Sequence, residues 1–371
     1  MTFPVPAGAA LTVDLGALAD NWRLLDRRAG ARGAASVVKA DAYGLGADFV
    51  TAALRKAGCR TFFVAYPDEG LALKPYADDA EILVLNAISK DGLAVCRDRG
   101  LTPVLNSTVE TGWWLDNGRE QPAALMVDTG MSRLGLTPTE ALICAGRFRP
   151  RLLMSHLACA DETGHRLNRQ QIESFQAVRR AFADVDSSLA NSAGHFLDGA
   201  DFDLTRAGIA LYGGAPLPGE ANPMRNVATL TAIVTQVRRV AAGTSVSYGA
   251  TAIMSRDTLI AVTAIGYADG VPRSASGSGV PARADGSRGG QGAIGGRLVP
   301  IRGRVTMDTT LFDVTDCTAE PVKPGDRIEL FGAELSLDDA ATAAGTISYE
   351  LLTGIGRRVE RRYTIGTSTG A

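Results

Sequence analysis

Lys39 stands in the stretch SVVKADAYGLG, residues 36–46, where a lysine is unexpected. The small and β-branched residues before it, Ser36-Val37-Val38, predict the end of a buried strand. An unpaired ammonium loses its hydration at such a position, so lysine is rare there. A lysine held in an apolar mouth near cationic groups has a lowered pKa and can form a Schiff base, and this is the chemistry that the position suggests.

Further polar residues follow other apolar runs of the chain: Asp128, Arg133, His156, Asn191, Ser192, Arg206 and Gly208. Ser192 stands beside a predicted helix start, and together with the Gly208 and Ile209 amides it would suit a phosphate group. A Schiff-base lysine combined with a phosphate site indicates pyridoxal 5′-phosphate (PLP).

Each of these residues also has an ordinary structural interpretation. Lys39 can reach solvent from a strand end, and the NSAG motif that contains Ser192 can be a simple helix N-cap. His156 can be a hydrogen-bonded core histidine, and Arg206 can be an ion-pair partner. The functional interpretation therefore depends on all of them occurring together.

The elements that must position these residues repeat one unit, an apolar run followed by a loop and a helix-period segment. Eight apolar runs are present, at residues 35–40, 61–65, 81–86, 101–106, 123–128, 151–158, 187–191 and 204–213. Eight strands with seven connections predict an α/β fold, an N-terminal (β/α)8 TIM-like barrel, with a doubly wound open sheet as the alternative. Catalytic groups of such a barrel gather at the carboxyl ends of its strands.

The repeat of apolar runs and helix-period segments ends at about residue 223. After it, alternating apolar runs and turn residues predict a C-terminal β-rich domain. We expect the barrel over residues 10–223 and the β-rich domain over 224–371, with residues 1–9 packed on the latter. Residues 274–296 are rich in Gly and Ser and predict a long mobile hairpin loop.

The composition of the chain limits which partners the protein is expected to bind and which cellular compartment it is expected to occupy. A formal charge of −2 gives no indication of a nucleic-acid or anionic-membrane partner, and no apolar run approaches a membrane span. The opening residues 1–20 lack the basic region of a signal peptide. Five scattered cysteines without C-x-x-C spacing favour reduced thiols in the cytoplasm and no zinc or other metal site.

Taken in order, the motifs resemble those of the alanine racemase family, PLP enzymes with a barrel followed by a β-domain. VVKADAYGLG is similar to the family's PLP-lysine signature, and the resemblance runs from TVDLGALADNWRLL near the start to ISYELLTGIGRRVERRY near the end. Between them stand VDTGMSRLG, SHLACADE, NSAG, TRAGIALYGG, VSYGAT, GYADG and VTMD. The resemblance implies interconversion of L- and D-alanine by a homodimer, supplying D-alanine for peptidoglycan.

The resemblance also implies roles for single residues. Lys39 would hold PLP and act as the base on one face of the substrate, and Tyr248, from the other subunit, would be the base on the opposite face. Arg206 would face the pyridine nitrogen, and His156 would lie beside the ring, linked to Tyr248. The residues implied to bind the phosphate are Tyr43, Ser192, Gly208, Ile209 and Tyr349.

The remaining implied roles concern the substrate. Arg133 would steady the cofactor's phenolic oxygen and the substrate carboxylate, which the backbone N–H of Met307 would also bind from across the interface. Tyr267 and Asp308 would line the entrance.

The sequence departs from the family pattern at a few places. Many relatives carry a carbamylated lysine that orients the arginine equivalent to Arg133, and Met126 occupies that position here. The usual GHG ends as GLG at Leu45, and Thr306 and Thr309 flank the Met-Asp pair where relatives have Cys and Gln. Met126 carries no charge, so the resemblance leaves open what orients Arg133. The changes at Leu45, Thr306 and Thr309 leave both bases intact and bear on the substrate more than on the reaction.

Other functions remain as alternatives. A serine or broad-specificity racemase uses the same chemistry, and a non-catalytic PLP carrier resembles the barrel alone. ALMVDTG is locally similar to an aspartic protease, but that chemistry needs a second Asp-Thr/Ser-Gly, which this chain lacks.

Overall fold

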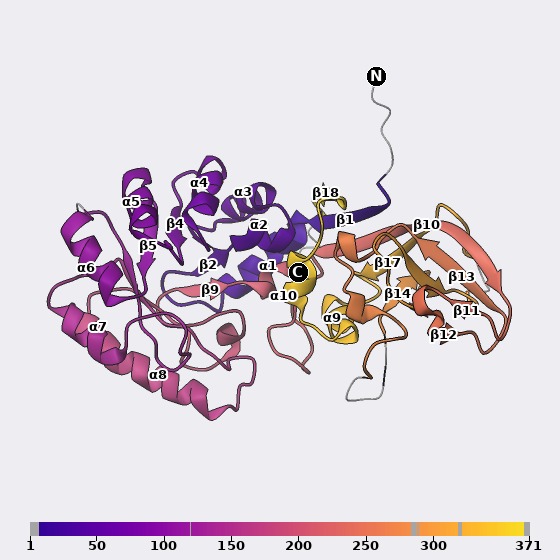
Figure 1. Ribbon diagram of the computed structural model, residues 1–371. Coiled ribbons are helices and arrows are strands. Elements are labelled where there is room, and N and C mark those ends of the chain that lie inside the picture. The colour runs from indigo at the N-terminus through magenta and orange to yellow at the C-terminus, as the bar shows by residue number, and fades with distance from the viewer. Residues whose placement is uncertain (1–6, 119, 283–286, 288, 318–320, 367–371) are drawn as a thin grey trace, which may run out of the picture. The chain divides into compact units, whose positions relative to one another are not determined.

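The computed structural model describes residues 7–118, 120–282, 287, 289–317 and 321–366. These residues form two compact units (Figure 1). Among the described residues, one unit comprises residues 16–225, and the other comprises residues 7–15 together with those from 226 to 366.

Residues 16–225 contain the eight parallel strands that the apolar runs predict, so the barrel is confirmed and the open sheet is not. Neighbouring strands follow the order β8-β7-β6-β5-β4-β3-β2-β9. Backbone hydrogen bonds from Leu204 to Ser187 (3.1 Å) and from Arg206 to Ala190 (2.9 Å) join the two ends of this series. The strands are β2 (Ala34–Val37), β3 (Thr61–Val64), β4 (Glu81–Val84), β5 (Thr102–Leu105), β6 (Ala124–Met126), β7 (Leu152–Met154), β8 (Ser187–Ser188) and β9 (Thr205–Ala207).

Helices lie outside these strands, as Figure 1 shows for α4, α5 and α6. Ser89, Ser107 and Thr137 begin α5, α6 and α7 because their hydroxyls accept the backbone N–H three residues on. The helices of this unit are α1 (Leu15–Asp26), α2 (Lys39–Gly44), α3 (Ala47–Ala57), α4 (Pro67–Ala77), α5 (Lys90–Arg99), α6 (Thr108–Asn117), α7 (Pro138–Ala145) and α8 (Arg166–Arg179), with short 3₁₀ turns η1 (Arg180–Phe182), η2 (Ala193–Phe196) and η3 (Ile209–Tyr212).

Side chains alternate between the inside of the barrel and the layer under the helices, because successive strand residues point to opposite faces. Met126 packs with the interior cluster, whereas its neighbours Leu125 and Val127 pack with the outer one. The interior cluster takes one or two apolar residues from most of the strands: Ala35, Phe63, Leu83, Val104, Ala124, Met126, Leu152, Met154 and Leu204.

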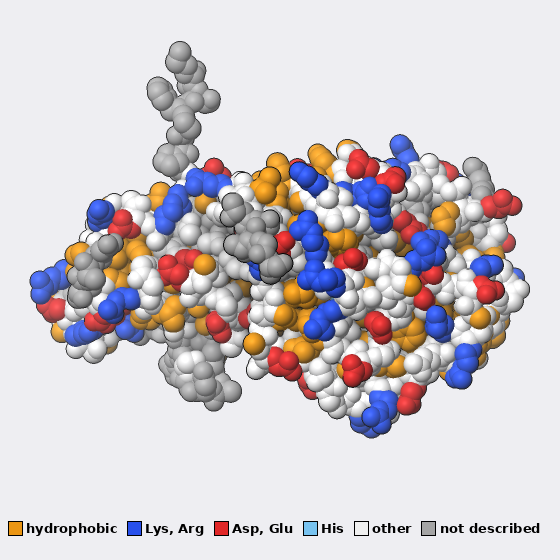
Figure 2. Space-filling view, turned by 180° about the vertical axis from the view of Figure 1, so that it is seen from behind, with side chains coloured by type: hydrophobic (Ala, Val, Ile, Leu, Met, Phe, Trp, Pro, Cys, Tyr) orange, Lys and Arg blue, Asp and Glu red, His pale blue; other side chains and the backbone are white. Residues whose placement is uncertain are grey.

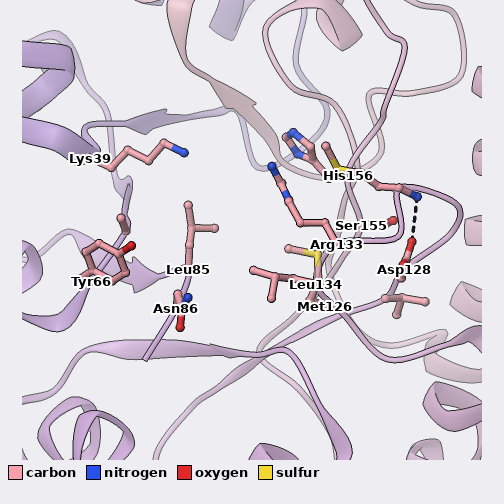
Figure 3. A pocket seen from close by; sticks show the side chains of 13 residues that line it. Lys39, Tyr66, Leu85, Asn86, Met126, Asp128, Arg133, Leu134, Ser155 and His156 are labelled. Atoms are coloured by element: carbon pink, nitrogen blue, oxygen red, sulfur yellow. Dashed lines mark hydrogen bonds between the residues drawn. The ribbon is translucent and has the colours of Figure 1, made fainter. Parts of the chain in front are cut away.

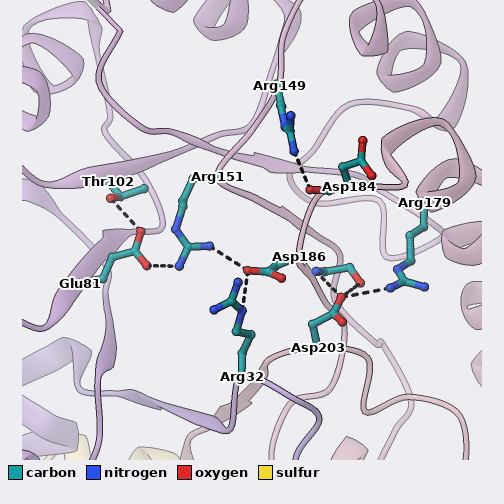
Figure 4. Close-up of polar contacts among 10 residues, drawn as sticks. Arg32, Glu81, Thr102, Arg149, Arg151, Arg179, Asp184, Asp186 and Asp203 are labelled. Atoms are coloured by element: carbon teal, nitrogen blue, oxygen red, sulfur yellow. Dashed lines mark hydrogen bonds and ion pairs between the residues drawn. The ribbon is translucent and has the colours of Figure 1, made fainter.

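Charged side chains join the amino ends of several strands (Figure 4). Arg151 bonds to Glu81 at 3.0 Å and to Asp186 at 3.3 Å, and Arg32 reaches the same Asp186 at 2.9 Å. Asp203 accepts hydrogen bonds from the Ser187 N–H (2.8 Å) and hydroxyl (2.7 Å). These contacts link segments far apart in the sequence at the end of the barrel opposite to Lys39, where TIM barrels carry stability more than catalysis.

The second unit is β-rich, as the sequence predicts. Its main sheet follows the order β15-β14-β17-β10-β1-β18, with β13 and β16 attached through β10. Strand β1, which falls in the range expected for the barrel, pairs antiparallel with β10 and parallel with β18. Residues 1–6 of the predicted packing segment lie outside the described residues.

The strands of this unit are β1 (Ala9–Asp14), β10 (Ala228–Val240), β11 (Ser245–Val246), β12 (Ala252–Ile253), β13 (Thr258–Thr263), β14 (Gln291–Ile294), β15 (Arg297–Pro300), β16 (Thr310–Asp313), β17 (Arg327–Phe331) and β18 (Glu360–Thr364). The helices are α9 (Leu337–Ala344) and α10 (Ser348–Thr353), with 3₁₀ turns η4 (Tyr248–Ala250), η5 (Tyr267–Asp269) and η6 (Arg273–Ala275).

The loop predicted over residues 274–296 is shorter at its end than the sequence suggests. Residues 291–294 form β14, which pairs with β15 across a turn at Gly295 and Gly296, both with positive φ. Pairing with a neighbouring strand overrides the weak strand propensity of this Gly-rich segment. Residues 283–286 and 288 of the predicted loop lie outside the described residues.

On the face shown in Figure 2, acidic and basic side chains are interspersed. Within the described part of the chain, no helix has both the length and the apolar character needed to cross a membrane.

Candidate active site

Lys39 is followed by a strained left-handed turn. Ala40, Asp41, Ala42 and Tyr43 have φ values of 53°, 55°, 52° and 58°. Left-handed backbone costs a residue other than glycine roughly 1–2 kcal/mol. Four such residues in a row persist only where surrounding contacts hold them, and strain of this kind clusters at functional sites.

Backbone and side-chain contacts hold this turn. Ala42 N–H bonds to Val38 O at 2.9 Å, and Gly46 N–H bonds to Asp41 O at 3.0 Å. The Asp41 carboxylate accepts the N–H of Ala47 at 2.8 Å, at the start of α3. The turn therefore begins at the end of β2 and finishes firmly on α3, which fixes the direction in which Lys39 leaves the strand.

The Lys39 side chain reaches into a pocket of about 220 Å³ (Figure 3). Burial, and then the charge of Arg133, lower the pKa of Lys39, while the Glu69 carboxylate opposes them. Figure 3 shows Lys39 on one wall, pointing toward Arg133 and His156 on the other. The lining residues are Lys39, Ala65, Tyr66, Leu85, Asn86, Met126, Val127, Asp128, Met131, Arg133, Leu134, Ser155 and His156.

The loop that carries Arg133 is organised by one carboxylate. Asp128 Oδ1 accepts the N–H groups of Gly130 and Met131 at 2.9 Å and that of Ser132 at 3.1 Å. Burial raises the pKa of Asp128, but these hydrogen bonds outweigh it and leave the pKa below its ordinary value. Asp128 is therefore a charged cap of the loop, and Met126, where the departure from the family pattern lies, faces the same pocket as Arg133.

Arg206 is a buried cation beside His156. One of its Nη atoms donates to Ser188 Oγ at 2.5 Å, and the other to the Ser155 (2.5 Å) and Leu189 (3.2 Å) carbonyls. Burial lowers the pKa of Arg206 to about 9, which still leaves it charged at neutral pH.

His156 is neutral in this setting. Its Nδ1 lies 3.2 Å from Arg206 Nη2, so Nδ1 accepts and the ring proton belongs on Nε2. Burial, and then the charges of Arg206, Arg133 and Lys39, lower the pKa of His156 to about 3. Lys39 and Arg133 line the pocket and Arg206 lies behind His156, so three basic groups surround one neutral imidazole, which favours an anionic ligand.

A second group of residues forms a small cradle, which we define as Tyr43, Ser192 and Gly208. Ser192 Oγ accepts the N–H of Gly208 at 2.9 Å and that of Ala210 at 3.3 Å, which leaves its O–H to donate to a ligand. A Cβ on Gly208 would stand 2.8 Å from the Tyr43 hydroxyl, so only glycine keeps this space open. Ile209 is buried and begins the 3₁₀ turn η3 behind the cradle.

Tyr43 is held rigidly in the cradle. Its ring stacks on Tyr212 with a centroid distance of 4.7 Å, and Tyr212 donates its hydroxyl hydrogen to Val37 O at 2.8 Å. Hydroxyl donors converging on a site without a side chain are what a phosphate group requires.

In the β-rich unit, three of the predicted residues come together. Tyr267 N–H bonds to Thr306 O at 2.9 Å and Ala268 N–H to Met307 O at 3.1 Å, which ties the GYADG and VTMD loops to one another. Arg358 bonds to Asp308 at 2.8 Å and to Asp269 at 2.7 Å. Among the described residues, the backbone N–H of Met307 has no acceptor in the structure.

Tyr248 and Tyr349 also belong to this unit. Tyr248 is 73% exposed on η4, after Ser247 with a φ of 64°. The Ser247 hydroxyl donates to Arg304 O at 2.7 Å, which fastens the turn that presents the phenol. Tyr349 lies in α10 and is half-exposed.

Some residues in and around the pocket belong to no motif that sequence reasoning recognises. Glu69 looks like an ordinary first-turn carboxylate of α4, yet it contacts the backbone next to Lys39. Tyr66, Leu85 and Asn86 line the pocket but follow predicted strands without any chemical motif. Their role depends on strand order, since β3 stands next to β2 and β4 stands next to β3.

The fold and this pocket define a class: (β/α)8-barrel proteins with a lysine amine of lowered pKa and an anion cradle at the carboxyl ends of the strands. Comparison with known proteins shows which family within this class the chain matches. Residues 13–216 match the family model described as "Alanine racemase, N-terminal domain", and residues 227–363 match "Alanine racemase, C-terminal domain". The chain belongs to the alanine racemase family.

Individual relatives match over nearly their full length. The "Alanine racemase, biosynthetic" of Agrobacterium fabrum is 50% identical over 366 residues, covering 96% of this chain and 93% of that protein. The alanine racemase of Rhizobium meliloti is 49% identical over 371 residues, covering 97% and 98%. The crystal structure of the Bartonella henselae alanine racemase "with covalently bound pyridoxal phosphate" is similar with a TM-score of 0.89 at 35% identity, covering 97% of this chain and 100% of that one.

Proposed function

We propose that this protein is a PLP-dependent racemase that interconverts L-alanine and D-alanine. The observation that carries the proposal is the Lys39 amine of lowered pKa, which shares its pocket with Arg133 and His156. Membership of the alanine racemase family and the covalent PLP of the Bartonella henselae relative support the same reaction.

The residues present fit PLP. Lys39 would hold it covalently, and the cradle of Tyr43, Ser192 and Gly208 has the donors and the open space that a phosphate needs. Ile209 and, from the β-rich unit, Tyr349 would complete the phosphate site. When bound, PLP supplies an electron-withdrawing ring that makes the α-proton of an amino acid easier to remove.

Racemisation requires two bases, one on each face of the α-carbon. Lys39 would exchange the proton on one face and Tyr248 of the partner subunit on the other, in a homodimer with shared active sites. Each positioned base contributes roughly 10²–10⁴-fold. The lowered pKa of Lys39 supports its part, because it increases the unprotonated fraction of the amine at neutral pH.

Arg206 and His156 would support the ring of the cofactor. Arg206 would hold the ring nitrogen and would not give up its proton to it, because a guanidinium remains charged. By leaving the ring nitrogen unprotonated, Arg206 would limit how strongly the cofactor withdraws electron density, and this would suppress side reactions such as transamination. His156 would lie beside the ring and link it to Tyr248.

The substrate carboxylate would bind to Arg133 and to the backbone N–H of Met307, which lacks an acceptor among the described residues. Tyr267 and Asp308 would line the entrance, and the Arg358 contacts support this because they fix both loops. Thr306 and Thr309 hydrogen-bond to one another, which steadies the loop that carries Met307 and Asp308.

We also propose that the protein acts in the cytoplasm and supplies D-alanine for peptidoglycan. The five free cysteines support a reducing compartment, and the name of the Agrobacterium fabrum relative supports a biosynthetic role. Complementation of a D-alanine-requiring bacterium tests the second statement. Failure of a well-expressed chain to support growth without D-alanine would refute it.

Turnover of a panel of L-amino acids in deuterated water tests the reaction and the bases together. We expect alanine to exchange and racemise fastest, Lys39→Ala to abolish both, and Tyr248→Phe to lower racemisation at least 100-fold. Tyr76→Phe, at another exposed tyrosine, is the matched control and should match the parent.

Each alternative has its own outcome in this experiment. If serine or lysine is turned over faster than alanine, that amino acid is the substrate and alanine is not. If the protein binds PLP without any turnover, it is a non-catalytic PLP carrier. Full racemisation by Tyr248→Phe in both directions would refute the two-base assignment.

A further inference from the structure

Glu69 contacts two different loops with its two carboxylate oxygens. Oε2 accepts the N–H of Ala65 at 2.7 Å and that of Tyr66 at 3.4 Å, in the loop that leads into α4. Oε1 accepts the N–H of Ala40, the residue after Lys39, at 2.7 Å. One side chain therefore joins the end of β2 to the end of β3, and Ala65 and Tyr66 both line the pocket that contains Lys39.

Two later helices of the barrel, α6 and α7, show what a glutamate in the first helical turn ordinarily does. Glu110, at the third position of α6, accepts the N–H of Asn106 at 2.5 Å, and Glu140, in α7, accepts the N–H of Thr137 at 2.8 Å. Each of these carboxylates bonds within its own loop. Starting the helix requires no contact with another strand, so the bond from Glu69 to Ala40 is additional to capping.

The bond to Ala40 falls where the backbone is most strained. Ala40 is the first of the four left-handed residues, and the first N–H groups of any helical turn lack partners within the turn. The Glu69 carboxylate satisfies this N–H with a charged acceptor, which forms a stronger hydrogen bond than a neutral one. Without it, the turn can relax toward right-handed backbone, and the direction of Lys39 changes with it.

We propose that Glu69 is a positioning residue, which holds the left-handed turn so that the Lys39 amine stays aimed into the pocket. This rests on the proposed function, since it is the Lys39 amine that would capture PLP. Glu69 touches neither cofactor nor substrate in this role. It acts through the backbone of Ala40.

The test compares Glu69→Ala and Glu69→Gln with Glu110→Ala and Glu110→Gln, the matched controls in α6. Protein freed of PLP is mixed with PLP, and the rate of covalent capture is followed by absorbance. Binding of pyridoxamine 5′-phosphate, which has no aldehyde and cannot link to lysine, is measured alongside. A capture rate does not depend on racemisation.

We expect Glu69→Ala to slow covalent capture at least tenfold and to change the dissociation constant of pyridoxamine 5′-phosphate less than threefold. Glu69→Gln keeps a single acceptor oxygen and should fall between Glu69→Ala and the parent. The rate constant kcat for alanine should drop with capture while KM changes less than threefold. Both Glu110 variants should capture PLP as fast as the parent.

Capture by Glu69→Ala at the rate of Glu110→Ala would overturn the proposal and reduce Glu69 to a helix cap. So would loss of folding in both Glu69 variants but in neither Glu110 variant. A parent protein that captures PLP and does not racemise alanine would refute the proposed function instead, and the capture comparison would still decide the role of Glu69.

Discussion

Gly208→Ala should weaken the binding of PLP, because the new methyl group would occupy the cradle. The added Cβ would lie 2.8 Å from the Tyr43 hydroxyl oxygen and 3.6 Å from Ser192 Oγ. The first distance is shorter than an ordinary contact, so Tyr43 or the backbone at residue 208 must move. Tyr43 is poorly placed to yield, since it is buried, stacked on Tyr212 and part of the left-handed turn.

Overpacking of a rigid site costs about 1–3 kcal/mol. If this cost falls on the bound state, the dissociation constant for PLP rises about 5- to 150-fold. Titration of the PLP-free protein with PLP, followed by absorbance, measures this constant, and thermal unfolding of the PLP-free protein shows how much of the cost falls on folding.

Gly112→Ala is the matched control, because a Cβ there meets nothing within 4 Å and the residue lies inside α6. It should leave the affinity for PLP unchanged and stabilise the fold by about 0.5–1 kcal/mol. An affinity of Gly208→Ala within twofold of the parent, with an unchanged unfolding temperature, would show that residues 43, 192 and 208 do not enclose the phosphate.

Three further outcomes follow from the barrel. Ala40→Gly removes a Cβ at a φ of 53° and should raise the unfolding temperature, by the equivalent of about 1 kcal/mol; a lower unfolding temperature would contradict the assigned backbone. Arg206→Lys keeps the charge but loses most of the contacts to residues 155, 156, 188 and 189, so we expect a loss of at least about 2 kcal/mol in thermal or denaturant unfolding, and parent-like stability would refute it. Burial raises the pKa of Asp203, but bonds from Ser187 and Arg179 outweigh it and leave that pKa below its ordinary value. The charged Asp203 therefore stabilises the fold above about pH 4, and this stabilisation is lost as the pH falls through the folded-state pKa. Asp203→Asn should therefore unfold more easily than the parent at pH 7, by about 1–3 kcal/mol, and the difference should shrink below pH 4 in urea titrations; a constant difference would contradict this.

The positions of the barrel strands could be predicted because burial leaves a local trace. A strand covered on both faces is a short apolar run, and all eight runs coincide with strands of the structure. Strand β14 was missed because its sequence, QGAI, has little strand propensity of its own, and pairing with β15 and β17 decides its conformation.

Among the site residues, Lys39 could be found because a lysine conflicts with the apolar run that precedes it. Glu69 could not be found in the same way, since a glutamate in the first turn of α4 agrees with the local pattern. The structural part of its role, the bond to Ala40, involves a residue 29 positions away and exists only because β2 and β3 are neighbours.

The amino-acid sequence by itself determined which segments are buried, in what order strands and helices alternate, and which residues are chemically out of place. These follow from side-chain type and spacing, which act over a few residues. Only the tertiary structure decided that four residues after Lys39 take left-handed backbone, that Arg206 bonds to two neighbouring segments, and that Tyr43 and Gly208 share one cradle. Closure of the barrel brings these groups together, and their geometry depends on contacts between residues up to 165 positions apart, for which no local pattern exists.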